Sequence, residues 1–288
     1  MRNKLISYPL KDGHHPHFHF TIGKTRVAKE FHDHTHSYSE LVITLGGTAA
    51  HRINDNVHMI KAGDVFVMQG TVSHGFTDCR DLVLCNIGYY PAMLAPIEHY
   101  VRRSPGYQAV FLIGPAQHEH AICTMKLPLP DIRELEPMID RMIAEYLAKK
   151  IGYEAVLTGM FHGFVVELIR RYTPHATDAP ESILKLAAMI SHMEAHFLEP
   201  LRLHELARMA GLSERQLLRV FRANYHTTPI DYMLRLRIMH ASRLLRDTDT
   251  PIADIAFASG FSDSNYFTRQ FKRIIGQTPS AYRTFVIR

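Results

Sequence analysis

The sequence predicts a two-domain protein, with an N-terminal all-β barrel followed by helices and a C-terminal all-α domain that contains two helix-turn-helix motifs joined by a long helix. Three observations predict this fold class. Short strand-like segments fill the first part of the chain, a motif is repeated near its end, and the excess of positive charge is confined to the last third. A chain of 288 residues is long enough for about two domains.

The barrel is predicted from strands and turns that alternate between about Val27 and Ile87. Residues that favour turns interrupt the apolar segments at Gly46-Gly47, at Asn54-Asp55-Asn56 and at Ala62-Gly63-Asp64. The predicted strands are 41–45, 49–53, 57–60, 65–68 and 82–87. Strands at intervals of about eight to twelve residues, with Gly and Asn or Asp at the turns, are typical of a sandwich or a small barrel.

Two amphipathic helices are predicted next, because apolar residues recur at helical spacing. The two apolar stripes consist of Leu135, Ile139, Met142, Ile143 and Tyr146, and of Val156, Met160, Phe161, Phe164, Val165, Leu168 and Ile169. Either both stripes pack on the barrel or on each other, or part of them forms a seam between two copies of the chain. Two prolines and small polar residues then predict a linker. We assign residues 1–125 to the barrel domain, 126–172 to a helical dimerisation region, 173–182 to the linker and 183–288 to the C-terminal domain.

The C-terminal domain contains an internal repeat. Residues 203–224 and 252–274 keep the same apolar skeleton, first at an offset of 49 residues and then at an offset of 50. Ala207 and Ala256 are small where two helices would cross, and Gly211 and Gly260 follow where a turn needs positive φ. Ser213 and Ser262 are predicted N-caps of the second helix of each copy. A single motif of this kind is a weak signal, but two in register predict two helix-turn-helix units.

The charge distribution supports a nucleic-acid partner for this domain. Residues 201–288 contain 14 Lys and Arg against 7 Asp and Glu, whereas residues 1–200 contain 19 against 21. Cations gain affinity for DNA by releasing condensed counterions. A solvated charged surface is the alternative for charge alone, but charge and repeat together favour DNA.

This segment resembles the DNA-binding domain of the AraC/XylS family of bacterial transcription regulators. The second copy carries the family signature as IADIAFASGFSDSNYFTRQFKRIIGQTPSAYR, from Ile252 to Arg283, and the resemblance spans about a third of the chain. The resemblance implies that a long helix over 230–245 joins the two helix-turn-helix units. It also implies that their recognition helices enter successive major grooves, about 34 Å apart, of double-stranded promoter DNA. It further implies an effector-responsive regulator with RNA polymerase as a partner. We expect an activator, with a repressor as the alternative that the sequence leaves open. We expect a homodimer, since two copies would supply two DNA-binding units.

The recognition positions of the family map onto both copies of the repeat. Arg pairs with guanine and Asn or Gln with adenine, so both helices carry base-reading chemistry. Glu214 and Asp263 are equally well explained as residues that favour a helix start, and Arg219 and Arg269 as surface ion pairs. The candidate DNA-binding residues are Ser213, Glu214, Arg215, Gln216, Arg219, Asp263, Ser264, Asn265, Thr268 and Arg269.

The histidines of the barrel suggest its site. His34, His36 and Glu40, followed by Gly47, are similar to the first motif of cupins, and Gly63 with His74 is similar to the second. The proline, glycine and asparagine of that second motif are replaced by Gln69, Thr71 and Asp78. The resemblance implies a cupin-like jelly roll. Side chains alternate along a strand, so the first three residues are expected on one strand and on one side, inside the barrel.

Two interpretations of these polar residues remain open. His34, His36, Glu40 and His74 suit a divalent metal such as Zn, Fe, Mn or Ni; alternatively they bind a small effector without metal, together with Tyr38 and Arg52. The segment Leu82–Pro91 and the pair Gly106-Tyr107 resemble regulators of sugar operons such as the rhamnose group, which implies a carbohydrate effector. A metal ion as the effector is the second possibility.

Other classes of protein are less well supported. A metal-dependent cupin enzyme would need a general base beside the metal, but the attached DNA-reading domain favours ligand sensing, so we expect no enzyme. A purely architectural DNA binder would not need the barrel. Three cysteines, Cys79, Cys85 and Cys123, favour a reducing compartment. Because no apolar signal segment or membrane-length stretch is present, we expect a cytoplasmic protein without membrane contact.

Overall fold

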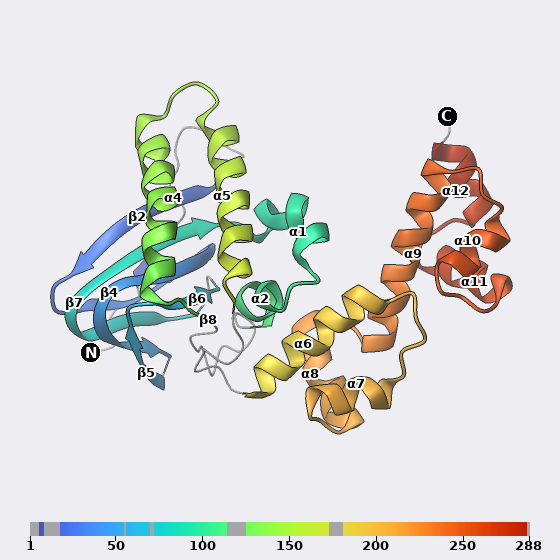
Figure 1. The fold of residues 1–288 in the computed structure, drawn as a ribbon, viewed down its shortest axis with the longest axis horizontal. Helices are drawn as coiled ribbons and strands as arrows, with labels where there is room; N and C mark the ends of the chain where they lie inside the picture. The colour runs from blue at the N-terminus through green and yellow to red at the C-terminus, as the bar shows by residue number, and fades with distance from the viewer. Residues whose placement is uncertain are drawn as a thin grey trace. The chain divides into compact units, whose positions relative to one another are not determined.

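The computed structural model describes residues 6–8, 18–54, 56–69, 72–113, 125–172 and 181–286, and it divides into two compact units, residues 1–187 and 188–288. The first unit contains the strands and the second is helical (Figure 1). The N-terminal residues up to 17 other than 6–8, Cys123 and most of the predicted linker lie outside the described residues. Among the described residues, none of the helices is long and apolar enough to cross a bilayer.

The first unit is built on an eight-stranded, mainly antiparallel sheet. Its strands are β1 Ile6–Tyr8, β2 Phe20–Val27, β3 Phe31–His36, β4 Ser39–Ile53, β5 Asn56–Lys61, β6 Asp64–Met68, β7 His74–Tyr89 and β8 Met125–Lys126. The long strands β4 and β7 pair along most of their length, and each is extended by two further partners. One half of β7 pairs with β2 and the other with β3, while β4 pairs with β6 and then β5. Among the described strands, the pairing of β1 with β3 is the parallel one.

The prediction that a strand ends at Gly46-Gly47 was wrong. The strand β4 continues through both glycines, and its register with β7 shifts between Thr44 and Ala50. Gly47 has φ +74°, and a Cβ atom there would lie 2.3 Å from the carbonyl oxygen of Arg80. The two glycines therefore form a β-bulge inside one long strand. The other two predicted turns lie between strands, after β4 and after β5.

The helices α4 Leu129–Ala148 and α5 Tyr153–Arg170 lie side by side over one face of the sheet (Figure 1). Their apolar stripes form one core with the outward faces of β2, β4 and β7, including Phe20, Leu41 and Ile87. The stripes are thus buried within the chain, which is the first of the two alternatives. Val156 is exposed and Leu157 takes the buried position, so the predicted stripe of the second helix began one residue early. Four short segments complete the unit: η1 Pro91–Leu94, α1 Ala95–Val101, α2 Pro105–Tyr107 and the π-helical turn η2 Gln108–Ile113.

A second core lies on the opposite side of the same strands. It contains Val27, Val42, Phe66, Phe76 and Leu84, all buried. Because alternate residues of a strand point to opposite faces, β2, β4 and β7 each contribute to both cores. These three strands therefore lie between helices α4 and α5 on one face and the second core on the other.

The second unit is helical and contains two similar helix pairs. Its helices are α6 Glu181–His196, which begins in the first unit, α7 Leu203–Ala210, α8 Glu214–Tyr225, α9 Pro229–Asp247, α10 Ile252–Ala258, α11 Ser264–Ile275 and α12 Pro279–Val286. Glu181 and Ser182, predicted to lie in the linker, are the first residues of α6. The long helix α9 connects the pair α7–α8 to the pair α10–α11 (Figure 1).

The turns of the two helix pairs follow the repeat. Gly211 and Gly260 have φ +66° and +78°, and Ala207 and Ala256 are buried, as predicted. The side chain of Ser213 caps α8 by accepting a hydrogen bond from the backbone of Gln216. The predicted cap Ser262 was wrong, because Asp263 begins α11 and its carboxylate accepts the backbone N–H groups of Asn265 and Tyr266. The extra residue of the second copy moves the cap by one position.

Candidate functional site

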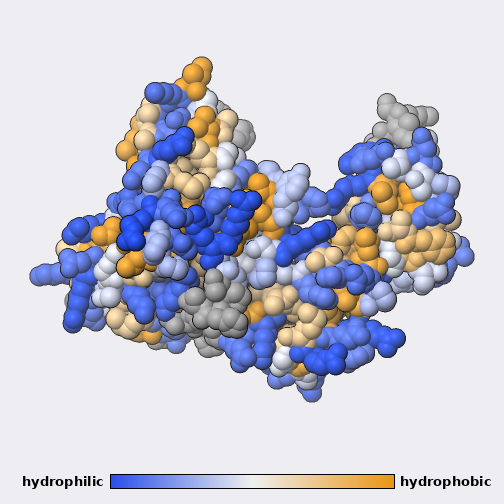
Figure 2. All heavy atoms as spheres, in the orientation of Figure 1, coloured by the Kyte–Doolittle hydropathy of each residue, from blue (hydrophilic) through white to orange (hydrophobic). Residues whose placement is uncertain are grey.

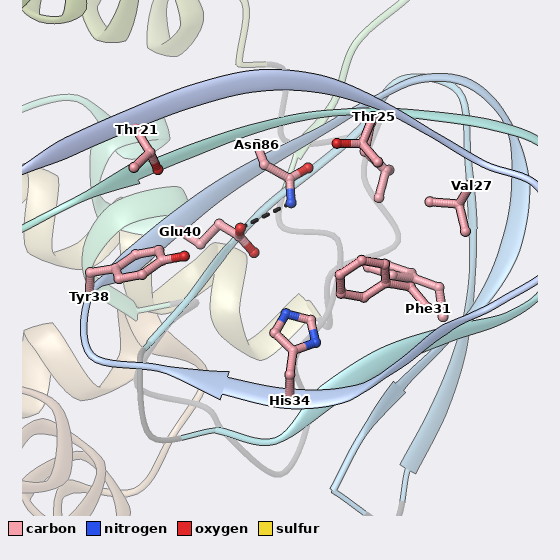
Figure 3. Close-up of a pocket in the computed structure, with 10 residues that line it drawn as sticks. Thr21, Thr25, Val27, Phe31, His34, Tyr38, Glu40 and Asn86 are labelled. Atoms are coloured by element: carbon pink, nitrogen blue, oxygen red, sulfur yellow. Dashed lines mark hydrogen bonds between the residues drawn. The ribbon is translucent and has the colours of Figure 1, made fainter. Parts of the chain in front are cut away.

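A cavity of about 300 Å³ lies in the first unit, on the face of the sheet that carries the second core. The side chains that line it converge from several strands, with polar groups at one end and apolar groups at the other (Figure 3). The lining residues are Thr21, Thr25, Val27, Phe31, His34, Tyr38, Glu40, Phe76, Leu84 and Asn86. Hydroxyl, amide, imidazole and carboxyl groups thus face the same space as two phenylalanine rings. Such a cavity can bind a small polar molecule that also has an apolar face.

Glu40 lies at the polar end of this cavity. Its Oε1 accepts a hydrogen bond from Nδ2 of Asn86 at 3.0 Å (Figure 3). Among the described residues, neither Oε2 of Glu40 nor Oδ1 of Asn86 has a hydrogen-bond partner, although both atoms are buried. A buried acceptor without a donor costs free energy, so both atoms are suited to meet a ligand.

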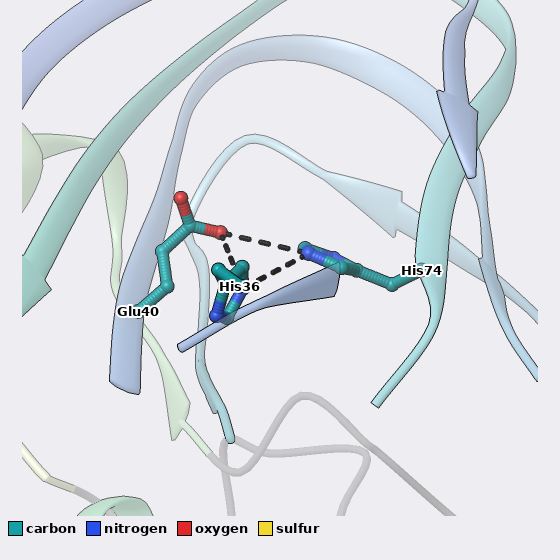
Figure 4. A group of neighbouring side chains, drawn as sticks. All are labelled: His36, Glu40 and His74. Carbon is teal, nitrogen blue, oxygen red and sulfur yellow. Dashed lines mark hydrogen bonds and ion pairs between the residues drawn. The ribbon is translucent and has the colours of Figure 1, made fainter. Parts of the chain in front are cut away.

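Three side chains beside the cavity bring their polar atoms together (Figure 4). Nε2 of His36 lies 3.2 Å from Nε2 of His74. Oε2 of Glu40 lies 3.7 Å from the first nitrogen and 3.8 Å from the second. The three residues come from three strands, β3, β4 and β7, so the expectation of three ligands on one strand was wrong. The bend at Ser37-Tyr38 separates His36 from Glu40.

Hydrogen bonds orient the rings of this histidine group. Nδ1 of His36 lies 2.7 Å from the carbonyl oxygen of Tyr38, and because a carbonyl only accepts, Nδ1 carries the proton. The lone pair of Nε2 then faces His74 and Glu40. His51, which the sequence reasoning missed, places its Nε2 3.4 Å from Nδ1 of His74. It therefore orients the ring of His74 from behind, as outer partners of metal-binding histidines do.

Burial favours the uncharged form of each member of this group. It lowers the pKa of His36 to about 4 and that of His51 to about 3, and it lowers the pKa of His74 well below its ordinary value. Burial also raises the pKa of Glu40 to about 7, against the opposing effect of the hydrogen bond from Asn86. Both trends have one cause, because a charged group is poorly solvated inside the sheet.

The donor set fits a divalent transition metal. Ligand atoms about 2.0–2.2 Å from such a metal lie about 3.0–3.5 Å from one another. The 3.2 Å between the two histidine nitrogens lies within this range, and Oε2 of Glu40, at 3.7 and 3.8 Å from them, would move slightly closer to both on binding a metal. Two neutral imidazoles and a carboxylate are ligands typical of Zn, Fe, Mn or Ni. Among the described residues, these three are the possible metal ligands whose donor atoms lie close enough together to share one ion.

The structure separates the other predicted site residues of the first unit. His34 pairs with His74 across β3 and β7, but it lines the cavity rather than joining the compact group. Tyr38 lines the cavity too. Arg52 points away from it and binds Asp33 at 2.9 Å, half-exposed to solvent. Thr21, Thr25 and Asn86 line the cavity and were not predicted; they lie on strands whose inward face the sequence alone does not reveal.

The second unit presents a different kind of surface. In α8, Glu214, Arg215, Gln216 and Arg219 are exposed, and in α11, Asn265 and Arg269 are exposed. Basic residues that were not predicted extend both surfaces, namely Arg222 in α8 and Lys272 in α11. Each lies three residues after Arg219 or Arg269, on the same helix face, and this spacing could have revealed them. Cationic helix faces of this kind suit the phosphates and bases of DNA.

Several of the predicted DNA-binding residues also have structural partners. Oε1 of Gln216 accepts hydrogen bonds from the backbone and the hydroxyl of Ser213. Asp263 caps α11, and the hydroxyl of Thr268 donates to the carbonyl of Ser264. The guanidinium of Arg269 lies 6.0 Å from the ring of Tyr266. Asp263 thus has the helix-start role that was its alternative interpretation.

Known proteins match both units of the chain. A family described as "Helix-turn-helix domain" matches residues 206–284, and one described as "AraC-like ligand binding domain" matches residues 21–155. The "HTH-type transcriptional activator RhaR" of Shigella boydii serotype 4 is 30% identical over 255 residues, which cover 88% of this chain and 87% of that protein. The protein of that name from Enterobacter sp. (strain 638) is 29% identical over 254 residues, with the same coverage. A solved AraC-type transcriptional regulator from Chromobacterium violaceum is 37% identical, covers 35% of this chain and 89% of its own, and has a TM-score of 0.33.

The two units and these matches define a DNA-binding transcription regulator with a ligand-binding domain. The chain belongs to the AraC family of transcriptional regulators. Its curated relatives are transcriptional activators and not enzymes.

Proposed function

We propose that the chain is an effector-responsive transcription activator whose cavity binds a carbohydrate and whose two helix pairs read promoter DNA as two helix-turn-helix units. The cavity carries the first half of this proposal. It combines hydroxyl, amide and carboxyl groups with the rings of Phe31 and Phe76, and a sugar ring offers hydroxyl groups at its edge and C–H groups on its faces. The sequence similarity to regulators of sugar operons favours the same ligand class.

A binding screen tests the effector proposal. Purified full-length chain is titrated with a panel of monosaccharides and polyols, and the melting temperature and calorimetric heat are recorded. At least one sugar should raise the melting temperature, because a ligand that binds only the folded state stabilises it. Asn86→Leu should abolish that shift, whereas Thr158→Val, on α5 outside the cavity, should keep it. If every sugar leaves the melting temperature unchanged at millimolar concentration, the carbohydrate proposal is wrong.

The DNA half of the proposal rests on the two similar helix pairs. The exposed faces of α8 and α11 carry Arg215, Arg219 and Arg269 in the family's recognition positions. A footprint of the full-length chain should protect two successive major grooves on one face of the duplex, about 34 Å apart. An effector changes DNA binding or contact with RNA polymerase if its affinity differs between two states of the protein.

A divalent metal bound by His36, Glu40 and His74 is the second candidate ligand, favoured by the separations of their donor atoms. A bound metal would stabilise the ionised carboxylate of Glu40 and would leave a coordination position for a hydroxyl of the effector. Elemental analysis of purified protein should find about one equivalent of metal, and His36→Ala should lose it. Metal-free protein that binds its effector and its DNA normally would refute this role.

Homodimer formation is also part of the proposal. The apolar stripes of α4 and α5 are buried on the sheet, so a seam must use other residues. Exposed apolar side chains lie at the end of the α4–α5 hairpin, where Leu147 and Ile151 are on the surface (Figure 2). Sedimentation with operator DNA and effector present should show two chains per complex. Leu147→Glu combined with Ile151→Glu should shift the complex toward one chain, and a monomer under all conditions would refute dimerisation.

A further inference from the structure

Arg237, in the middle of α9, connects three segments of the second unit. Its guanidinium donates to three backbone carbonyls: Nε to Phe197 at 2.6 Å, Nη2 to Glu199 at 2.7 Å and Nη1 to Gly260 at 2.7 Å. Phe197 and Glu199 follow α6 and lead into the helix pair α7–α8. Gly260 is the turn residue of the pair α10–α11. One side chain thus holds the turn of the second pair against the segment that enters the first.

The chemistry of this contact requires an arginine. A guanidinium is planar and carries five N–H donors in a fixed fork, so it can serve three carbonyls at once. Hydrogen bonds from a charged donor are about twice as strong as neutral ones. The guanidinium also lies 5.9 Å from the ring of Phe261, the residue that follows the turn. A lysine at this position has one nitrogen and cannot span the three carbonyls.

The turn glycine shows how closely the two segments approach. A Cβ atom at Gly260 would lie 2.6 Å from the carbonyl oxygen of Leu198 and 3.1 Å from Nε of Arg237. The backbone of the second helix pair therefore touches the backbone of the segment before the first pair. This close approach leaves little freedom for one pair to rotate relative to the other.

A second connection across the unit is more exposed. Nη2 of Arg273 lies 3.1 Å from Oδ1 of Asp231, and the two side chains are 54% and 41% exposed. Exposed ion pairs contribute little to stability. Arg237, which is half-buried and bonded to backbone, is the stronger of the two connections.

We propose that Arg237 is a positioning residue that fixes the distance and rotation between the two helix pairs, so that the protein binds DNA half-sites at one spacing only. This inference rests on the proposal that both helix pairs read DNA. Inserting one base pair between half-sites moves them apart by about 3.4 Å and rotates one by about 35°. A rigid reader cannot follow this change, whereas a loosened one can.

Binding to DNA of altered spacing tests the proposal. A bipartite site is selected from random duplex DNA with the full-length wild-type chain and located by footprinting. Affinities are then measured for that site, for versions with one base pair inserted or deleted, and for each half-site alone. The proteins are wild type, Arg237→Gln, Arg237→Lys and the control Arg246→Gln, which removes an exposed arginine of α9 that pairs with Asp247.

The expected result is a change in the dependence on spacing. The affinity of wild type and of Arg246→Gln should fall about 30-fold when one base pair is inserted. Arg237→Gln should bind the original site about tenfold more weakly than wild type, because a looser link lowers the effective concentration of the second helix pair. Its affinity should then fall only about threefold on insertion. Its affinity for single half-sites should stay within about twofold of wild type. Arg237→Lys should behave like Arg237→Gln, and it replaces that variant if circular dichroism shows that Arg237→Gln does not fold.

Two other results would overturn the inference in different ways. A wild-type footprint over a single major groove would refute two-unit reading and, with it, the role of Arg237. A footprint over two grooves, with Arg237 variants that keep the wild-type dependence on spacing or weaken half-sites as much as the whole site, would refute only the positioning role.

Discussion

Acidification from pH 7 to pH 5 should destabilise the first unit of the metal-free chain, because its buried imidazoles do not take up protons. His51 lies between the rings of Phe66 and Phe76, with ring centroids 4.8 Å and 4.6 Å away, and burial lowers its pKa to about 3. The pKa of His36 is lowered to about 4 for the same reason. In the unfolded chain these rings regain their ordinary pKa of 6.5. The unfolded state therefore binds more protons at pH 5, and stability falls as the pH falls below 6.5.

The magnitude follows from the distance between pH 5 and the ordinary pKa. At about 1.36 kcal/mol per pH unit, each of the two histidines lowers the free energy of unfolding by about 2 kcal/mol. Glu40 acts in the opposite direction, since burial raises its pKa from 4.5 to about 7. Its contribution is present at low pH and is lost as the pH rises from 4.5 through 7, so acidification regains about 2 kcal/mol. Between pH 7 and pH 5, the free energy of unfolding of Glu40→Gln should therefore fall by about 2 kcal/mol more than that of wild type.

Urea unfolding at pH 7, 6 and 5 in the presence of EDTA measures these differences. The chain has no tryptophan and 13 tyrosines, so tyrosine fluorescence and far-UV circular dichroism report the transitions. His51→Gln keeps a side chain that can form a hydrogen bond with His74. Its free energy of unfolding should fall by about 2 kcal/mol less than that of wild type over the same pH range. Equal pH dependence in wild type, His51→Gln and Glu40→Gln would show that these groups are not buried in the folded state as described.

Three further predictions concern the helices. Arg219→Ala should weaken specific operator binding by about 1–3 kcal/mol; unchanged footprints and affinity would remove Arg219 from the DNA interface. Phe161→Ala should lower the free energy of unfolding by about 3–5 kcal/mol in urea titrations, because its fully buried ring packs on Phe20 at 5.3 Å; a loss below 1 kcal/mol would contradict that packing. Gly260→Ala should destabilise the chain by about 1–3 kcal/mol, given its φ of +78° and the nearby Leu198 carbonyl. The matched change Gly163→Ala, in α5 with open space around the added Cβ, should instead stabilise the chain by about 0.5–1 kcal/mol. Thermal melts of the two variants and of wild type compare these effects.

The helical unit could be predicted closely because its signals are local. The predicted long helix over 230–245 is α9, which runs from Pro229 to Asp247. The glycines of the repeat have positive φ because an αL turn residue is required at each position. The cap of α11 was assigned to Ser262 instead of Asp263, because the repeat changes offset at that point. Contacts such as Arg237 to Gly260 join residues far apart in sequence, and periodicity carries no information about them.

The site in the first unit could be predicted from the sequence except where it depends on the bulge in β4. Alternation places Glu40, Val42 and Thr44 on one side of the strand, and without a bulge Arg52 would share that side. The extra residue at Gly46-Gly47 exchanges the two faces, so His51 points inward and Arg52 points outward. A bulge cannot be distinguished from a turn by two glycines alone. The sequence therefore located His36, Glu40 and His74 and missed His51.

The two faces of strand β2 have separate roles, and this separation affects how such a protein can acquire a new ligand. Thr21, Thr25 and Val27 of β2 face the cavity, whereas Lys24, on the opposite face, binds Glu136 and Asp140 of α4 at 2.8 Å and 2.7 Å. Substitutions at the cavity positions change the shape and polarity of the pocket and leave the contacts with the helices in place. Ligand specificity can thus diverge among descendants of one sequence while the ion pairs between β2 and α4 are inherited unchanged.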